Sequence, residues 1–206
     1  MNDASAPRRA ARRIGLFGGS FDPPHNAHLA FATLALASLG LDELRWIPAG
    51  QPWQKSRAIS TAQHREAMVR LAMGEEPRFV LERCELERAG PSYMLDTVRE
   101  LRAREPAAHW FLLIGQDQYA GLHTWHGWQE LLSLVTLAVA NRPGAPLLPN
   151  AAVSAVAHRA VPLPLMDVAS TDIRERVSSG LPIAHLVPAG VARYIDQHHL
   201  YAGSPG

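Results

Sequence analysis

Hydrophobic and polar positions along the chain alternate between two kinds of segment. Short runs rich in β-branched and aromatic residues predict strands, and longer stretches with helically spaced apolar residues predict helices between them. The first helical stretch, 27–39, is almost wholly apolar and is followed by Gly40, a residue suited to the C′ position. The predicted strands cover 13–17, 43–47, 79–82, 110–114, 135–140 and, more weakly, 160–165.

The starts of the later helices are predicted from capping residues. Ser60 with Gln63 three residues on forms a capping-box pattern, so a second helix is expected from Ser60 to Gly74. Another helix is expected after Ser92. Further helices are expected over 127–132, 172–177 and 189–198, and a proline-rich surface loop over 142–150.

The alternation of strands and helices predicts an α/β fold, a Rossmann-like doubly wound parallel sheet with helices on both faces, because parallel strands need crossover connections. Ligands of such sheets bind at the carboxyl ends of the strands, where the strand order reverses. Residues 18–28 and 115–128 are therefore the first candidates for a site. We expect a disordered tail over 1–12 and one domain over 13–206, with its C-terminal helical part, about 170–201, packed on the sheet.

Composition and charge narrow the partners. The chain has 206 residues, 47% of them hydrophobic, and a net charge of +1, so no global field favours nucleic acid or a membrane surface. We expect small-molecule substrates, and homo-oligomerisation stays open. The single cysteine, Cys84, is interpreted as a small buried residue, which suits a reducing compartment. No signal peptide or membrane span is recognisable, and a cytoplasmic location is expected.

The segment after the first strand, 18–28, carries residues suited to phosphate. Adjacent glycines let the backbone approach an anion, and the amides of the following helix start favour negative charge. His25 and His28 are three residues apart, so their rings can point to one side and donate to phosphate oxygens. The alternative is a tight turn whose histidines only cap the helix or fill the core. The segment matches neither the dinucleotide glycine fingerprint nor a P-loop.

This segment, GGSFDPPHxxH, resembles the H-x-G-H signature of the adenylyl- and cytidylyltransferase superfamily, and its sequence is similar to that of bacterial nicotinate-nucleotide adenylyltransferases. Ala27 stands where the signature has glycine, which narrows the expected ATP pocket slightly. The resemblance implies that Gly18, Gly19, Ser20, Phe21, His25 and His28 bind ATP, with both histidines also catalytic.

A second segment, STDIR over 170–174, resembles another signature of that family. By its chemistry alone, Ser170 or Thr171 can cap a helix whose amides face an anion, with Arg174 one turn along as a phosphate donor. An ordinary cap with an exposed arginine is the competing interpretation. The resemblance implies that all three residues bind ATP and that Arg174 is catalytic, with Ala169 where the family often has serine.

The resemblance also implies an acceptor site. In it, Asp117 of an Ile-Gly-x-Asp segment would accept hydrogen bonds from a ribose, and Trp125 would stack on a pyridine ring, whereas Trp128 is expected in the core. Tyr93 would bind the pyridine carboxylate through nearby amides, with Met94 in place of the family's threonine. Lys55 would reach the triphosphate or stay solvated, in a loop where Trp53 and Gln54 replace the family's proline and histidine, and the run over 188–201 is interpreted as packing.

The implied activity is transfer of the adenylyl group of ATP to nicotinate mononucleotide, which gives nicotinate adenine dinucleotide and pyrophosphate in NAD biosynthesis. Mg²⁺ would arrive with ATP, since no carboxylate cluster predicts a dedicated metal site. The same chemistry on nicotinamide mononucleotide, phosphopantetheine or flavin mononucleotide remains an alternative. So does a nucleotide-binding regulator without turnover, while an oxidoreductase is weakened by the missing glycine fingerprint.

Overall fold

The computed structural model describes residues 11–51, 59–141 and 150–202. In this part of the chain a six-stranded sheet has the order β3-β2-β1-β4-β5-β6, with every neighbouring pair parallel. The strand order reverses between β1 and β4, so the predicted doubly wound parallel sheet is confirmed. The strands are β1 (Arg13–Gly19), β2 (Glu43–Pro48), β3 (Phe79–Leu81), β4 (His109–Ile114), β5 (Thr136–Asn141) and β6 (His158–Pro162).

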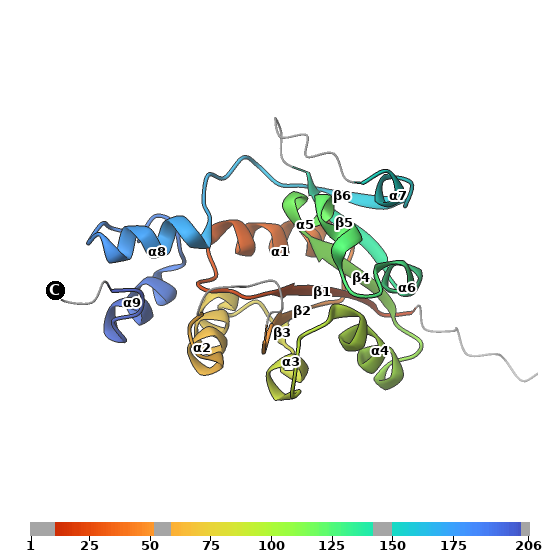
Figure 1. Cartoon of the computed structure of the whole chain (residues 1–206), viewed down its shortest axis with the longest axis horizontal. Coiled ribbons are helices and arrows are strands. Elements are labelled where there is room, and N and C mark those ends of the chain that lie inside the picture. The colour runs from red at the N-terminus through yellow and green to blue at the C-terminus, as the bar shows by residue number, and fades with distance from the viewer. Residues whose placement is uncertain (1–10, 52–58, 142–149, 203–206) are drawn as a thin grey trace, which may run out of the picture.

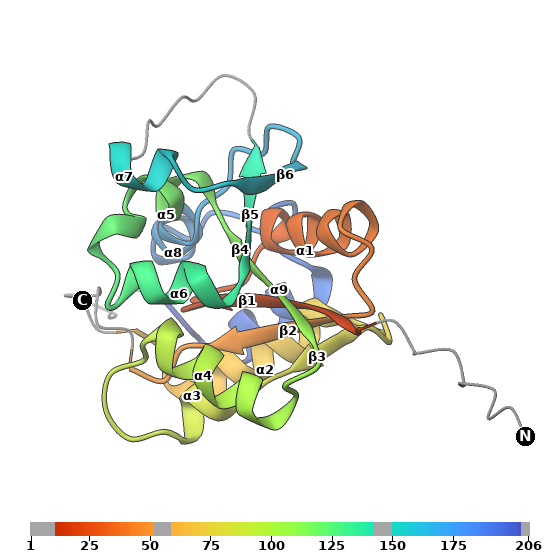
Figure 2. The same cartoon turned by 90° about the vertical axis from the view of Figure 1, so that its right-hand side faces the viewer.

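Helices cover both faces of the sheet (Figure 1). Buried apolar side chains of α1 (Asn26–Ser38) belong to one core cluster together with Val69 of α2 (Ala62–Met73), and those of α4 (Met94–Arg104) and α6 (Trp128–Leu134) belong to another. Figure 2 shows α1 on one side of the strands and α4 and α6 on the other. The remaining helices are α3 (Cys84–Glu87), α5 (Gln116–Ala120), η1 (Leu122–Thr124), α7 (Ala151–Ser154), α8 (Ser170–Ser178) and α9 (Ala189–Gln197).

The six predicted strands are present, the last beginning two residues earlier than expected, at His158. The predicted cap of α2 is wrong. Thr61 is the N-cap, and its hydroxyl accepts from the His64 amide at 3.4 Å, while the carbonyl of Ser60 accepts from Arg65 at 3.0 Å. Gly40 adopts φ +57° after α1, as its predicted C′ position requires.

The C-terminal helices α8 and α9 lie at one end of the molecule (Figure 1). We expected this part to pack on the sheet, but its buried apolar residues, such as Ile173 and Val191, form a cluster with Met68 and Ala72 of α2. Packing is therefore largely on α2. The single domain over 13–206 stays a prediction, and most of the expected tail lies outside the described residues. Among the described helices, none combines the length and apolar character needed to span a membrane.

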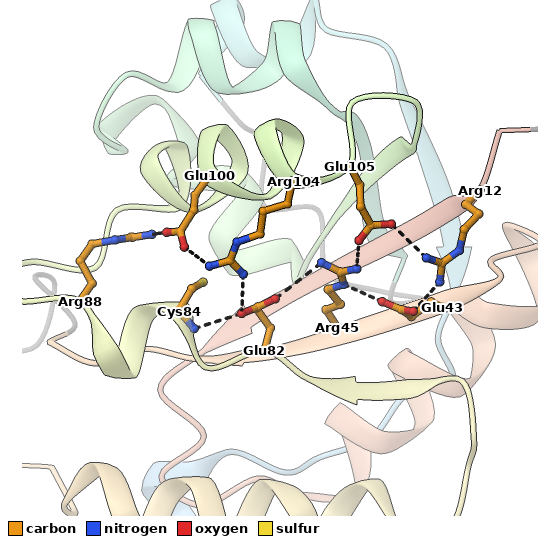
Figure 3. A network of polar contacts seen from close by, with 9 residues as sticks. All are labelled: Arg12, Glu43, Arg45, Glu82, Cys84, Arg88, Glu100, Arg104 and Glu105. Carbon is orange, nitrogen blue, oxygen red and sulfur yellow. Dashed lines mark hydrogen bonds and ion pairs between the residues drawn. The ribbon is translucent and has the colours of Figure 1, made fainter.

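A chain of ion pairs runs between β2 and α4 (Figure 3). Arg45 bonds to Glu43 at 2.6 Å and to Glu105, and only 10% of its side chain is exposed. Desolvation lowers the pKa of Arg45, but the bonds to these two carboxylates outweigh it and the pKa is raised. The ion-pair chain comprises Arg12, Glu43, Arg45, Glu82, Arg88, Glu100, Arg104 and Glu105.

Two sequence predictions concern residues at this chain of ion pairs. Cys84 lies beside it, and its amide donates to Glu82 at 3.2 Å. The thiol is buried, as predicted, and burial raises its pKa to about 12. Arg12 was expected in a disordered tail, yet it pairs with Glu43 at 2.5 Å and Glu105 at 3.0 Å. These contacts fix the chain just before β1.

Candidate active site

The turn between β1 and α1, residues 20–25, lies at the carboxyl end of β1, where the strand order reverses. Phe21 adopts φ +48° and is 2% exposed. Its ring packs so closely over Gly19 that a Cβ there would lie 3.1 Å from it. A glycine at position 19 therefore lets the turn fold back over the strand end.

The two histidines of this turn form a stacked pair. Their ring centroids are 3.6 Å apart with an interplanar angle of 24°, so the predicted placement of both rings on one side is confirmed. His25 is the N-cap of α1, and its amide donates to Nδ1 of His28 at 3.1 Å. A neutral His28 therefore carries its proton on Nε2, where it can donate to an anion. Capping and anion binding are compatible here, because they use different ring nitrogens of His28.

The start of α8 is bonded to this turn. Ser170 Oγ donates to the carbonyl of Pro23 at 2.9 Å, and Arg174 Nη1 donates to the carbonyl of Asp22 at 2.7 Å. The two predicted signature segments therefore meet in space. The prediction that Ser170 or Thr171 caps α8 is wrong: the N-cap is Ala169, and Thr171 Oγ1 instead accepts from Arg174 at 3.0 Å.

Asp22, one of the residues of the turn, is fully buried. Its Oδ1 accepts from the hydroxyl of Tyr201 at 2.7 Å and from the amide of Ser60 at 3.4 Å. Burial, followed by the bond to Asp22, raises the pKa of Tyr201. The sequence interpretation of Tyr201 as a packing residue is incomplete, since its ring packs on the C-terminal cluster while its hydroxyl holds the turn.

Arg65 on α2 is a structural residue of the site that sequence reasoning missed. Its side chain is 0% exposed and donates to the carbonyls of Ser20 at 3.0 Å, Gly50 at 3.2 Å and Ser60 at 3.0 Å. Desolvation lowers its pKa, opposed by the charge of Asp22. The sequence does carry one indication that Arg65 is buried: it lies at helical spacing from the apolar positions 68, 69 and 72, which form the buried face of α2.

The predicted acceptor residues lie beside the same strand end. A Cβ on Gly18 would lie 2.4 Å from Cε of Met94, so the Met94 side chain covers Gly18. Tyr93, just before α4, stacks on His126 with centroids 4.5 Å apart. The turn before α4 is thus joined both to β1 and to the loop that carries Trp125.

The other acceptor candidates come from the segment after β4. Asp117 is exposed in the first turn of α5. Trp125 and Trp128 are both partly buried and pack against the core cluster under α4 and α6, as expected for Trp128. Gly127 between them has φ +59°, and a Cβ there would lie 2.4 Å from Leu95, so only glycine fits without a shift.

Comparisons with known proteins bear on this arrangement. Residues 16–176 match the family model described as cytidylyltransferase-like. A protein from Methylibium petroleiphilum named "Probable nicotinate-nucleotide adenylyltransferase" is 54% identical over 201 residues, 95% of each chain. One of the same name from Albidiferax ferrireducens is 47% identical over 194 residues, 92% of this chain and 98% of its own. This chain belongs to the nicotinate-nucleotide adenylyltransferase family.

Solved structures share the fold of this adenylyltransferase family member. The Plasmodium falciparum nicotinic acid mononucleotide adenylyltransferase, described as complexed with APC and with NaAD, superposes with TM-scores of 0.73 and 0.74. The alignments cover 92% of this chain and 97% of the other at 15% identity. At that identity the likeness concerns the fold.

Beside the acceptor residues, this adenylyltransferase has a buried polar cluster around Glu85. Glu85 is 4% exposed and accepts from Thr97 Oγ1 at 2.8 Å. Burial raises the pKa of Glu85, opposed by the Thr97 bond, the charge of Arg88 and a bond from the Ser92 hydroxyl. The described residues hold no group of three or more His, Cys, Asp or Glu side chains arranged for a metal ion. Lys55, Trp53 and Gln54 lie outside the described residues.

Proposed function

We propose that the chain transfers the adenylyl group of ATP to nicotinate mononucleotide, with pyrophosphate as the second product. The observation that carries the proposal is the bonding of the α8 start to the β1–α1 turn through Arg174 and Ser170. It brings the amino ends of two helices and a histidine pair to one strand end. Amino ends of helices favour anions, so this place suits a triphosphate.

The triphosphate would lie between the β1–α1 turn and α8. Nε2 of His28 would donate to its oxygens, and His25, stacked on that ring, would flank the same groups. Arg174 would meet the charge that grows on the leaving pyrophosphate. The remaining ATP contacts are assigned to Gly18, Gly19, Ser20, Phe21, Ser170, Thr171 and Lys55.

Nicotinate mononucleotide would bind on the α4 side of the strand end. Trp125 would stack on the pyridine ring and Asp117 would accept from the ribose, while Tyr93 and Met94 would flank the pyridine. A phosphate oxygen of the mononucleotide then attacks the α-phosphorus in line, and the bond from that phosphorus to the bridging oxygen of pyrophosphate breaks. No covalent enzyme intermediate is needed, because the protein positions the reactants and stabilises charge.

Adenylyl transfer uses a divalent metal together with ATP, and we assign Mg²⁺ to this role as part of the ATP substrate. Mg²⁺ prefers phosphate, carboxylate and water oxygens and keeps several waters. The turn offers main-chain and imidazole donors instead, which fit the phosphate oxygens. In this assignment the metal reaches the site bound to ATP.

The test is a side-by-side assay of nicotinate and nicotinamide mononucleotides, with phosphopantetheine and flavin mononucleotide as further acceptors. With ATP and magnesium, nicotinate mononucleotide should give dinucleotide and one pyrophosphate per product, at the highest kcat/KM. A preference for the amide would overturn the nicotinate assignment. Saturable ATP binding without pyrophosphate release with any acceptor would identify a nucleotide-binding regulator.

A further inference from the structure

Gly50, two residues after β2, is bonded from two sides. Its amide donates to Ser92 Oγ at 3.0 Å, and its carbonyl accepts from Arg65 Nη2 at 3.2 Å. A Cβ at this position would lie 2.1 Å from the carbonyl oxygen of Glu85, so a side chain cannot be accommodated without moving backbone. We call residues 49–51 the Gly50 bridge.

One end of the Gly50 bridge is bonded to the proposed triphosphate side. Arg65, with 0% exposure, also donates to the carbonyl of Ser20 at 3.0 Å, and the amide of Ala49 donates to the carbonyl of Gly19 at 2.9 Å. A guanidinium presents its donors in one rigid plane. The bridge and the β1–α1 turn are therefore held in one fixed relation.

The other end is bonded to the proposed acceptor side. Ser92 Oγ also accepts from the amide of Gln51 at 3.1 Å, and the Ser92 amide donates to the carbonyl of Gln51 at 3.0 Å. A hydrogen bond from the Ser92 hydroxyl also lowers the pKa of the buried Glu85 carboxyl, against the larger effect of burial, which raises it. Ser92 directly precedes Tyr93, so these bonds fix the turn that would contact the pyridine.

We propose that Arg65 and Ser92 are positioning residues, which hold the Gly50 bridge from opposite sides and so set the ATP side and the mononucleotide side at the separation that in-line transfer needs. The inference rests on the proposed function, because it assigns one substrate to each side. Neither side chain needs to touch a substrate. A misplacement of about 1 Å between reacting groups costs roughly a hundredfold in rate, so the bonds of the bridge act on kcat.

The test compares Ser92→Ala, Arg65→Lys and the double variant with Val98→Ala, a core substitution on α4 at a residue that makes none of the hydrogen bonds of the bridge. Arg65→Lys keeps the charge and loses the planar fork. Each bridge variant should lower kcat about tenfold with smaller changes in either KM, while Val98→Ala stays within about twofold of wild type. Because both bonds end on Gly50, the double variant should lose about ten- to twentyfold and not the hundredfold product.

Hydrogen exchange at the amides of Gly50 and Gln51 gives a readout that needs no turnover. Both amides should exchange faster in Ser92→Ala and remain as in wild type in Val98→Ala. Three results would each overturn the proposed role of the bridge. The first is unchanged amide exchange in Ser92→Ala, and the second is a kcat of the bridge variants equal to that of Val98→Ala. The third is a loss of kcat in the double variant equal to the product of the two single losses. A wild-type protein that makes no dinucleotide would overturn the proposed function instead, and the exchange result would then decide the bridge alone.

Discussion

Two regions of this molecule concentrate arginine, and they bond it to different partners. In the ion-pair chain, arginines bond to carboxylates, as Arg45 does to Glu43 at 2.6 Å (Figure 3). At the β1–α1 turn, Arg65 and Arg174 donate to main-chain carbonyls at 2.7–3.2 Å. In the first region, arginine and glutamate side chains alternate. In the second, the dipoles of main-chain carbonyls orient the arginine side chains.

The difference concerns the kind of group that the arginines bond. A carboxylate cancels the charge of the arginine it bonds, whereas a main-chain carbonyl orients the guanidinium through its dipole. Asp22 supplies one carboxylate under the turn, but the amino ends of α1 and α8 add positive partial charge there. The turn therefore suits a polyanion, and the ion-pair chain suits a structural role.

The sharpest way to break this comparison is His28→Ala, which removes a donor from the turn and nothing from the ion-pair chain. Turnover should fall at least about a hundredfold, by analogy with the loss of one donor to transition-state charge. The fold should be retained, because His28 is only half-buried, and the free energy of thermal unfolding should fall by no more than the loss of its capping bond from the His25 amide, about 1 kcal/mol. The exposed His198 gives a matched control, whose alanine variant should turn over normally. Near-normal turnover of His28→Ala would reject the role given to its ring.

Arg174→Ala tests the cation held by carbonyls. A charge-assisted bond to the leaving group contributes about 2 kcal/mol, so kcat/KM should fall roughly thirtyfold. Arg176→Ala is the control on the same helix, since Arg176 donates to the carbonyl of Pro182 away from the turn. Equal effects of the two variants on steady-state kinetics would show that α8 contributes only packing.

Arg45→Met tests the ion-pair chain. The substitution keeps much of the side-chain volume and leaves Glu43 and Glu105 without their common partner. The free energy of unfolding should fall by about 2 kcal/mol, below the range for fully buried pairs because the carboxylates stay partly exposed. Urea denaturation measures this change. kcat per folded molecule should stay at the wild-type value, and a selective loss of kcat would remove the contrast between the two regions.

Periodicity predicted most of the fold because each strand and long helix carries its own local signal. Strands β1 and β4 are buried apolar runs, and the turn after β1 is recognisable by its glycines and histidines. Helices such as α3 and α7 were missed, since four residues give no measurable period. The failed cap predictions at Ser60 and Ser170 share one reason, which local rules do not contain: each residue donates to a distant segment, Ser60 through its amide to Asp22 and Ser170 through its hydroxyl to the carbonyl of Pro23.

The candidate site was predictable where a motif lies within one segment, and not where contacts join segments that are far apart in the sequence. His25 and His28 could be placed together from their spacing alone. The bonds of Arg65 to Ser20 and of Tyr201 to Asp22 join residues far apart in sequence, and only the assembled sheet brings them together. An arginine on the buried face of α2 was the one local hint.

The smallest expected effect comes from an exposed ion pair outside the ion-pair chain, which tests whether burial distinguishes the pairs of that chain from pairs at the surface. Arg99 bonds to Glu130 at 2.9 and 2.7 Å, yet about half of each side chain is exposed. Water and salt screen such a pair, and ordering two long side chains costs entropy. A double-mutant cycle of Arg99→Ala and Glu130→Ala, read by urea denaturation, should give a coupling within experimental error. A large coupling would show that burial does not distinguish the ion pairs of Arg45 from exposed pairs. The stability contributed by the ion-pair chain would then come from the number of its ion pairs and their geometry.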